Sequence, residues 1–248
     1  MLTIRFEQMA RMNLAKADFE ERMLRHIQRF FAARWKVCGA DGMRTLVQLG
    51  VTKAIGYRFS RPPAIGDYLS SMLYLGSGFD EDPKFPWAAA VLASGGEETA
   101  RARELKLTVL AFISDAEGME NEHLDAALAR LREMPMDELL PPRTTKNRTD
   151  YFVDRLRFVH PAKCEVIGVD ALARFVEQAV ERAAVHGFQE DGDVATFVAL
   201  AFMLGSSFDH DPQFPPLVKA LSTDTEDVAI RAARLFRAGR AYLQWSRV

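Results

Sequence analysis

The residues best suited to chemistry are four aspartates in two short acidic stretches. Residues 75–86 read LGSGFDEDPKFP, and residues 204–215 read LGSSFDHDPQFP. Carboxylates two residues apart occur in calcium-binding loops, but those loops also need a central glycine and a distal glutamate, which are missing here. A metal-dependent enzyme or effector that uses these turns is therefore the alternative hypothesis, and no metal ligands are predicted. The four aspartates are Asp80, Asp82, Asp209 and Asp211.

A structural role for the two stretches is the favoured interpretation, with each acting as a tight connector between helices. Asp80 and Asp209 are expected to accept backbone N–H bonds two residues further on, and the Asp-Pro pairs are expected to set the turn. The phenylalanines are expected to anchor each turn to the core. The residues of this turn motif are Phe79, Asp80, Asp82, Pro83, Phe85 and Pro86, and Phe208, Asp209, Asp211, Pro212, Phe214 and Pro215.

The other reactive side chains form no recognisable catalytic arrangement. The five histidines show no HExxH spacing, and GxSxG is absent. Cys38 and Cys164 lie far apart, in different halves, and two cysteines are no disulfide framework. The sequence therefore predicts no catalytic residue and no cofactor.

The two acidic stretches belong to a longer internal match. Nine of their twelve positions are identical, and the offset is 129 residues. The apolar pattern continues upstream without a gap, since Val47 matches Val176 and Phe59 matches Phe188. An ungapped register over about 45 positions indicates an internal duplication.

Each copy shows the same succession of helix signals and no convincing strand pattern. An amphipathic helix is followed by a nearly all-apolar one, predicted over 65–75 and 194–204, which Gly76 and Gly205 end. Pro86 and Pro215 suit the first position of a third helix. A fourth helix is predicted over 97–115 and 225–245.

The predicted fold class is all-α, with two tandem copies of a four-helix module packed as a pseudo-symmetric helical bundle. Residues 1–115 are assigned to copy one and residues 151–248 to copy two. Residues 116–150 are assigned to a linker with one short helix over 120–133. The rest of that linker contains prolines and a polar TTKNRTD tract that cannot continue a helix.

Composition limits the classes of function. The 32 basic and 34 acidic residues give a net charge of −2, which argues against a nucleic-acid partner. The N-terminus carries charge at once and has no apolar signal core, and no apolar run approaches the roughly 20 residues of a membrane span. A cytoplasmic protein is expected.

One segment has the composition of a protein-binding surface. Arg22, Arg25 and Arg29 alternate with apolar residues, which predicts an amphipathic helix with a basic face. Trp87 adds an aromatic side chain, and aromatic residues beside arginines are common in binding hot spots. These four residues are the predicted partner-binding residues, although a solvated basic face and a Trp87 packed within its own module would leave the same pattern.

The first half resembles a known set of proteins. It carries IRFEQM, then FEERMLRHIQRFF, then LGSGFDEDPKFPWAAAVL. Over residues 1–95 this order resembles poorly characterised helical proteins encoded in bacterial type VI secretion neighbourhoods. The most specific part runs from Phe79 to Ala88, and the second copy departs from it with Pro216 where the first has Trp87. The resemblance implies a helper, immunity or scaffold role and brings no catalytic residues with it.

The leading hypothesis is a non-enzymatic accessory, adaptor or immunity-type protein that binds another protein whose identity the sequence does not give. It depends on the duplicated module, the missing catalytic arrangement and the resemblance. Besides the metal-dependent alternative, a helical structural or oligomerising component remains open.

Overall fold

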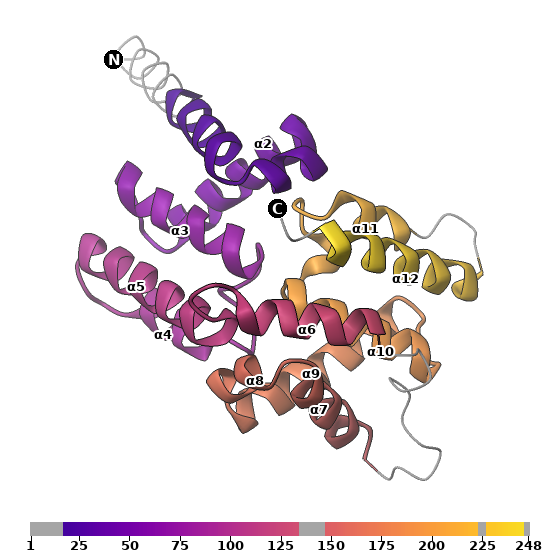
Figure 1. The fold of residues 1–248 in the computed structure, drawn as a ribbon. Helices are drawn as coiled ribbons and strands as arrows, with labels where there is room; N and C mark the ends of the chain where they lie inside the picture. Colours follow the sequence, from indigo (N-terminus) through magenta and orange to yellow (C-terminus); the bar gives the residue numbers. More distant parts are fainter. Residues whose placement is uncertain (1–16, 134–146, 223–226, 246–248) are drawn as a thin grey trace, which may run out of the picture.

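The structure, a computed structural model, describes residues 17–133, 147–222 and 227–245. Every regular element within these residues is helical, which confirms the all-α prediction for the described part of the chain (Figure 1). Apolar side chains recur along these helices at three- and four-residue spacing, so each helix has a stripe that it must bury. Tertiary packing of those stripes supplies most of the stability of such helices.

The first half contains a helix over residues 17–30 and then four labelled helices. They are α2 (Ala32–Gly56), α3 (Pro62–Leu75), α4 (Pro86–Ala93) and α5 (Glu98–Glu117). Within α2 the backbone kinks at Gly39, whose φ of 73° is in the region that favours glycine. The part of α2 that follows this kink is the amphipathic helix predicted from the sequence.

The second half follows α6 (Glu122–Glu133). It contains α7 (Arg148–Val159), α8 (Pro161–Ile167), α9 (Val169–Val185), α10 (Asp191–Leu204), the short 3₁₀ turn η2 (Phe208–His210), α11 (Pro215–Ala220) and α12 (Val228–Trp245). Gly168, with φ of 82°, separates α8 from α9 as Gly39 separates the two parts of α2. Both α3 and α10 correspond at the offset of 129 residues found in the sequence, at both ends.

Local sequence explains where several helices begin. Pro86 and Pro215 are the first residues of α4 and α11, as predicted. Glu97 caps α5 by accepting a bond from the Ala100 N–H, and Asn147 caps α7 through the Thr149 N–H. The end of the TTKNRTD tract therefore starts a helix, which corrects the expectation that the whole tract is non-helical.

Each half contains more helices than the four predicted. Beyond the four helices of the predicted module, the first half contains the start of α2 and the helix over residues 17–30, where the sequence predicts an amphipathic helix with a basic face. The second half contains α7 and α8 in addition. The sequence pattern does not indicate α8, because its seven residues are too few to show helical periodicity.

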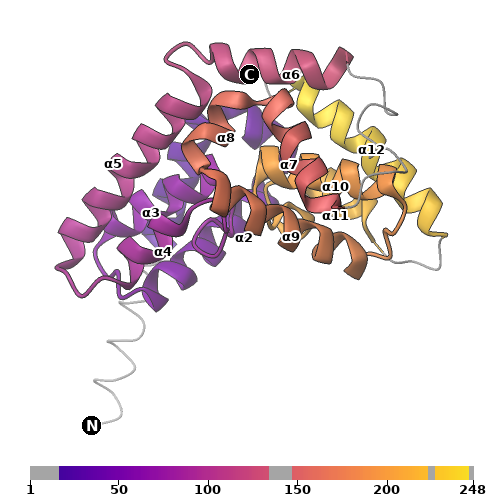
Figure 2. The same cartoon turned by 90° about the horizontal axis from the view of Figure 1, so that it is seen from below.

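One buried apolar cluster runs through both halves, from Leu24 to Leu235. Within the first half α3 packs against α2 and α5, and within the second α10 packs against α9 and α12. Across the halves α5 packs against α8. Helix α6 runs from the end of α5 across to α12 and contacts both (Figure 2).

The backbones of the two halves approach each other closely at Gly76 and Gly205, which follow the ends of α3 and α10. A Cβ on Gly76 would lie 2.9 Å from the Leu204 carbonyl oxygen, and a Cβ on Gly205 would lie 2.8 Å from that of Leu75. Their φ angles of 99° and 118° are also in the region that favours glycine. Both positions therefore require glycine for conformation and for space.

We predict that Gly76→Ala and Gly205→Ala each lower the free energy of unfolding by more than about 2 kcal/mol, because each combines backbone strain with a clash against backbone atoms. Urea denaturation measures this. Gly56→Ala is the matched control, since Gly56 ends α2 with nothing within 4 Å of an added Cβ. Equal effects at all three positions would contradict the assignment of a tight crossing.

Candidate functional site

The two acidic stretches, residues 75–86 and 204–215, cross each other and are called the crossed turns below. In the first turn Asp82 Oδ1 accepts a 2.9 Å bond from the Lys84 N–H, which closes the turn on itself. Its Oδ2 atom accepts a 2.9 Å bond from the Ser206 N–H in the other half. Asp82 therefore shapes its own turn and binds the opposite one.

Asp211 makes the corresponding contacts in the opposite direction. Its Oδ1 accepts from the Gln213 N–H at 2.9 Å, and its Oδ2 accepts from the Ser77 N–H at 2.7 Å. Asp211 is fully buried, and burial raises the pKa of its carboxyl while the bonds from Ser77 and Gln213 act against that rise. Buried bonds to a carboxylate are among the stronger hydrogen bonds in proteins.

These contacts correct the roles predicted for the aspartates. The bond two residues further on is made by Asp82 and Asp211, whereas Asp80 and Asp209 were expected to make it. Asp80 instead accepts from three side chains of its own half, which are Lys53 at 2.6 Å, Tyr57 at 3.1 Å and Tyr68 at 3.0 Å. Asp-Pro sets the turn because the aspartate directly before the proline is the one that closes it.

Asp209 holds the second turn in a related way with different partners. Arg182 donates to Oδ1, and His186 Nε2 lies 3.0 Å from Oδ2. Burial alone would raise the pKa of the Asp209 carboxyl, but bonds from His186 and His210 and the charge of Arg182 outweigh burial and hold that pKa well below its usual range. All four aspartates of the motif thus bind protein groups.

Two buried ammonium groups bind the last turn of α10. Lys84 Nζ donates to the Ala201 carbonyl at 2.8 Å and lies 3.1 Å from Asp82 Oδ2. Lys163 Nζ donates to the Phe202 carbonyl at 2.9 Å. Cations are favourable at a helix C-terminus, where carbonyl groups lack helical partners. Burial nevertheless lowers the pKa of Lys84, although Asp82 acts against that decrease.

No group of three or more histidines, cysteines, aspartates or glutamates in the described residues is arranged to hold a metal ion. Both thiols are buried and free of disulfides, and burial raises the pKa of Cys38 to about 11 and that of Cys164 to about 12. The raised pKa values keep both thiols protonated near neutral pH, which does not favour them as nucleophiles. The crossed turns form the joint between the halves.

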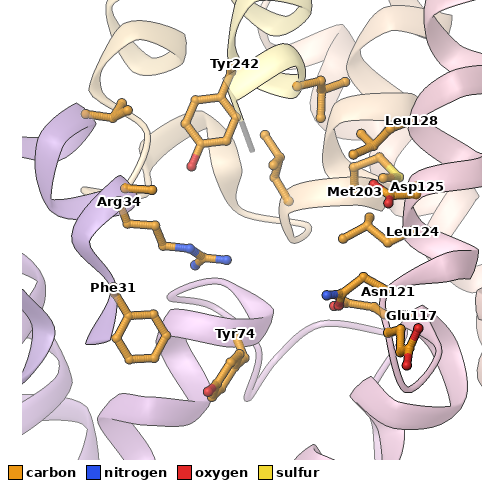
Figure 3. A pocket seen from close by; sticks show the side chains of 15 residues that line it. Phe31, Arg34, Tyr74, Glu117, Asn121, Leu124, Asp125, Leu128, Met203 and Tyr242 are labelled. Carbon is orange, nitrogen blue, oxygen red and sulfur yellow. The ribbon is translucent and has the colours of Figure 1, made fainter. Parts of the chain in front are cut away.

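A separate open cavity of about 510 Å³ lies beside this joint and is called the groove. Its walls come from α2, from the ends of α3, α5, α10 and α12, and from α6. Phe31, Tyr74 and Tyr242 line it, and Tyr74 is 44% exposed. Figure 3 shows the Arg34 guanidinium pointing into the space, toward Asn121 and Glu117 on the opposite wall. Pockets of this size that lie between structural units are frequent binding sites.

The groove is connected to the joint by one buried side chain. Arg34 Nη1 donates to Gln213 Oε1 at 2.8 Å, and Gln213 Nε2 donates to the Met72 carbonyl at 2.9 Å. Gln213 is fully buried, so its hydrogen bond fixes the orientation of the Arg34 guanidinium. Burial raises the pKa of Tyr242, against the effect of the nearby Arg34 charge.

The predicted partner-binding residues do not form one site. Arg22, Arg25 and Arg29 are exposed on the helix over residues 17–30. Trp87 is half-buried in α4. The centroid of its ring lies 5.8 Å from that of the Phe85 ring and 6.4 Å from that of the Phe112 ring. Figure 1 shows α4 and the helix over 17–30 on opposite sides of α3. The basic face thus stands without Trp87, and the packing of Trp87 agrees with a role inside its own half.

The sequence does not predict the groove, because its lining residues come from separate segments with no shared motif. The one available signal was Tyr74, a large aromatic residue on the exposed side of the otherwise apolar helix α3.

No protein-family model matches the chain, and comparisons with curated proteins and with solved structures found no match. Among the described helices, none is both long and apolar enough to cross a membrane.

We predict that Asp82→Asn lowers the free energy of unfolding by about 3–5 kcal/mol, because it leaves the buried Lys84 ammonium without its counter-charge. Adding Lys84→Met should restore at least about 1 kcal/mol of that loss. Urea denaturation of the two single variants and the double variant measures the coupling. Simple addition of the two single losses would show that the pair is not coupled.

We also predict an alkaline gain of stability that depends on Lys163. Burial and the Lys84 charge lower the pKa of Lys163 from 10.5 to about 8. Between pH 8 and pH 9 the folded protein loses this proton while the unfolded chain keeps it, so stability rises with pH by about 1 kcal/mol. The two thiols act in the opposite direction, because their pKa values rise on folding.

The measurement is therefore a comparison of wild type with Lys163→Met, in which the thiol effect is common to both. From pH 8 to pH 9 the change in the free energy of unfolding should be more positive in wild type than in Lys163→Met by about 1 kcal/mol. An identical change in both proteins would contradict the lowered pKa of Lys163.

Proposed function

We propose that the chain is a non-enzymatic accessory protein, of the adaptor or immunity type, that acts by binding another protein. The groove is the proposed binding site. The single observation that carries this proposal is that the groove presents aromatic side chains and a positioned Arg34 to solvent, whereas the motif aspartates bind protein groups. Aromatic residues and arginine are the side chains enriched in binding hot spots.

The finer fold prediction is part of this proposal. We propose that the halves are pseudo-symmetric copies of one duplicated helical module. It is supported by contacts that recur at the offset of 129 residues: Asp82 with Ser206 corresponds to Asp211 with Ser77. A duplicated module that joins its copies at the crossed turns leaves the ends of α3 and α10 side by side, where the groove opens.

The link to type VI secretion and the cytoplasmic location also remain proposals. They are supported by the resemblance over residues 1–95 and by the composition. The exposed basic face of Arg22, Arg25 and Arg29 is a second candidate contact surface within the same function, and it would suit an acidic region of the partner.

The proposal is tested by a photo-crosslinking amino acid placed at Tyr74 in the native host. We expect a discrete adduct with a second protein. Val185 is the control position, because it is 84% exposed and lies outside the groove. The same probe at Arg25 tests the basic face. Absence of an adduct at Tyr74, with adducts at Val185 or Arg25, would move the binding site away from the groove.

A further inference from the structure

We infer that the groove accepts an extended peptide segment of the partner that carries a lysine or arginine beside an apolar residue. This inference rests on the proposed function and adds the chemistry of the partner. Three features of the groove support it: the Glu117 and Glu120 carboxylates, the aromatic walls and the fixed Arg34 guanidinium.

Acidic side chains outnumber basic ones in the lining of the groove. Glu117, Glu120 and Asp125 line it against one arginine. Neither Glu117 nor Glu120 forms an ion pair among the described residues. The Glu117 charge acts to raise the pKa of Lys163, but Lys163 Nζ donates its hydrogen bond to the Phe202 carbonyl.

Glu117 also lies where a carboxylate is unfavourable. It is the last residue of α5, and the last turn of that helix holds no basic residue. Negative charge at a helix C-terminus is opposed by the helix dipole, and positive charge there is favoured. A cation brought to this wall by a ligand would therefore interact with Glu117, Glu120 and the end of α5 together.

The aromatic side chains suit the rest of such a segment. Phe31 and Tyr74 pack edge to face with centroids 5.4 Å apart, and Tyr242 packs against Phe214 in the same way. Aromatic faces attract cationic side chains and also bury apolar ones. Leu128 and Met203 add apolar surface to the lining.

Arg34 supplies hydrogen-bond donors for the backbone of the peptide. One of its nitrogens is held by Gln213, and no carboxylate pairs with it among the described residues. Its other N–H groups point into the groove (Figure 3) and can donate to backbone carbonyl oxygens. An acidic segment would gain this one arginine but would meet the carboxylates opposite, so the basic segment is favoured.

The test uses fluorescence polarisation with purified full-length protein and a positional library of twelve-residue peptides, acetylated and amidated at their ends. One central position is varied among lysine, arginine, methionine and glutamate between leucines. We expect lysine and arginine peptides to bind at least tenfold more tightly than glutamate peptides, a difference of about 1.4 kcal/mol. Equal binding of all peptides, or no binding of any, would overturn the inference.

Variants locate the effect. Glu117→Gln combined with Glu120→Gln should weaken the lysine peptide at least tenfold and leave the methionine peptide nearly unchanged. Glu104→Gln is the matched control, because Glu104 is exposed on α5 outside the groove. Melting temperatures of all variants show whether they remain folded. Glu120→Lys should shift the binding preference toward the glutamate peptide. Retention of the lysine preference in the double variant would overturn the inference.

The two proposals fail separately. If a probe at Tyr74 captures a protein whose crosslinked peptide lacks lysine and arginine, the inferred chemistry is wrong and the protein-binding function stands. If basic peptides bind as expected but no protein is captured at Tyr74, Arg25 or Val185, the groove chemistry stands and the proposed function is contradicted.

Discussion

The reciprocal burial of two carboxylates at the centre of the molecule is the constraint on which the rest of the structure depends. Asp82 and Asp211 each accept a backbone N–H from the opposite half, at a place where both are almost wholly shielded from water. Such groups are costly to bury unless fully bonded, so the two turns fit only in one mutual arrangement. That arrangement brings Gly76 and Gly205 into contact and fixes how the halves lie.

One of the three departures between the two matched stretches changes how the joint is held. Lys84 in the first turn corresponds to Gln213 in the second, and each reaches a carbonyl in the last turn of the opposite helix. Lys84 is charged and stays within the joint, whereas Gln213 is neutral and uses its oxygen to hold Arg34. This one difference between the two matched stretches lets Gln213 hold Arg34, whose guanidinium points into the groove.

The residues of the joint and those that line the groove are largely different sets. The repeated motif drew attention because aspartates can bind metals, yet its carboxylates serve turns and helix ends within the chain. The groove beside it is made from side chains that the motif does not contain, with α6 as one wall. Helix α6 runs from the end of α5 to α12 (Figure 2) and closes one side of the groove.

The sequence by itself determined the helical class of the described residues, the 129-residue offset between α3 and α10, the proline starts of α4 and α11, and the glycine ends of α3 and α10. These follow from local periodicity and from backbone restrictions, which act within a few residues. It misassigned the roles of Asp80 and Asp209, because an aspartate at either position of each motif could accept a local turn bond. Only the tertiary structure decided which carboxylate crosses to the other half, where Trp87 packs, and which residues line the groove. Those depend on side chains more than a hundred positions apart meeting in space, and no local pattern records such a meeting.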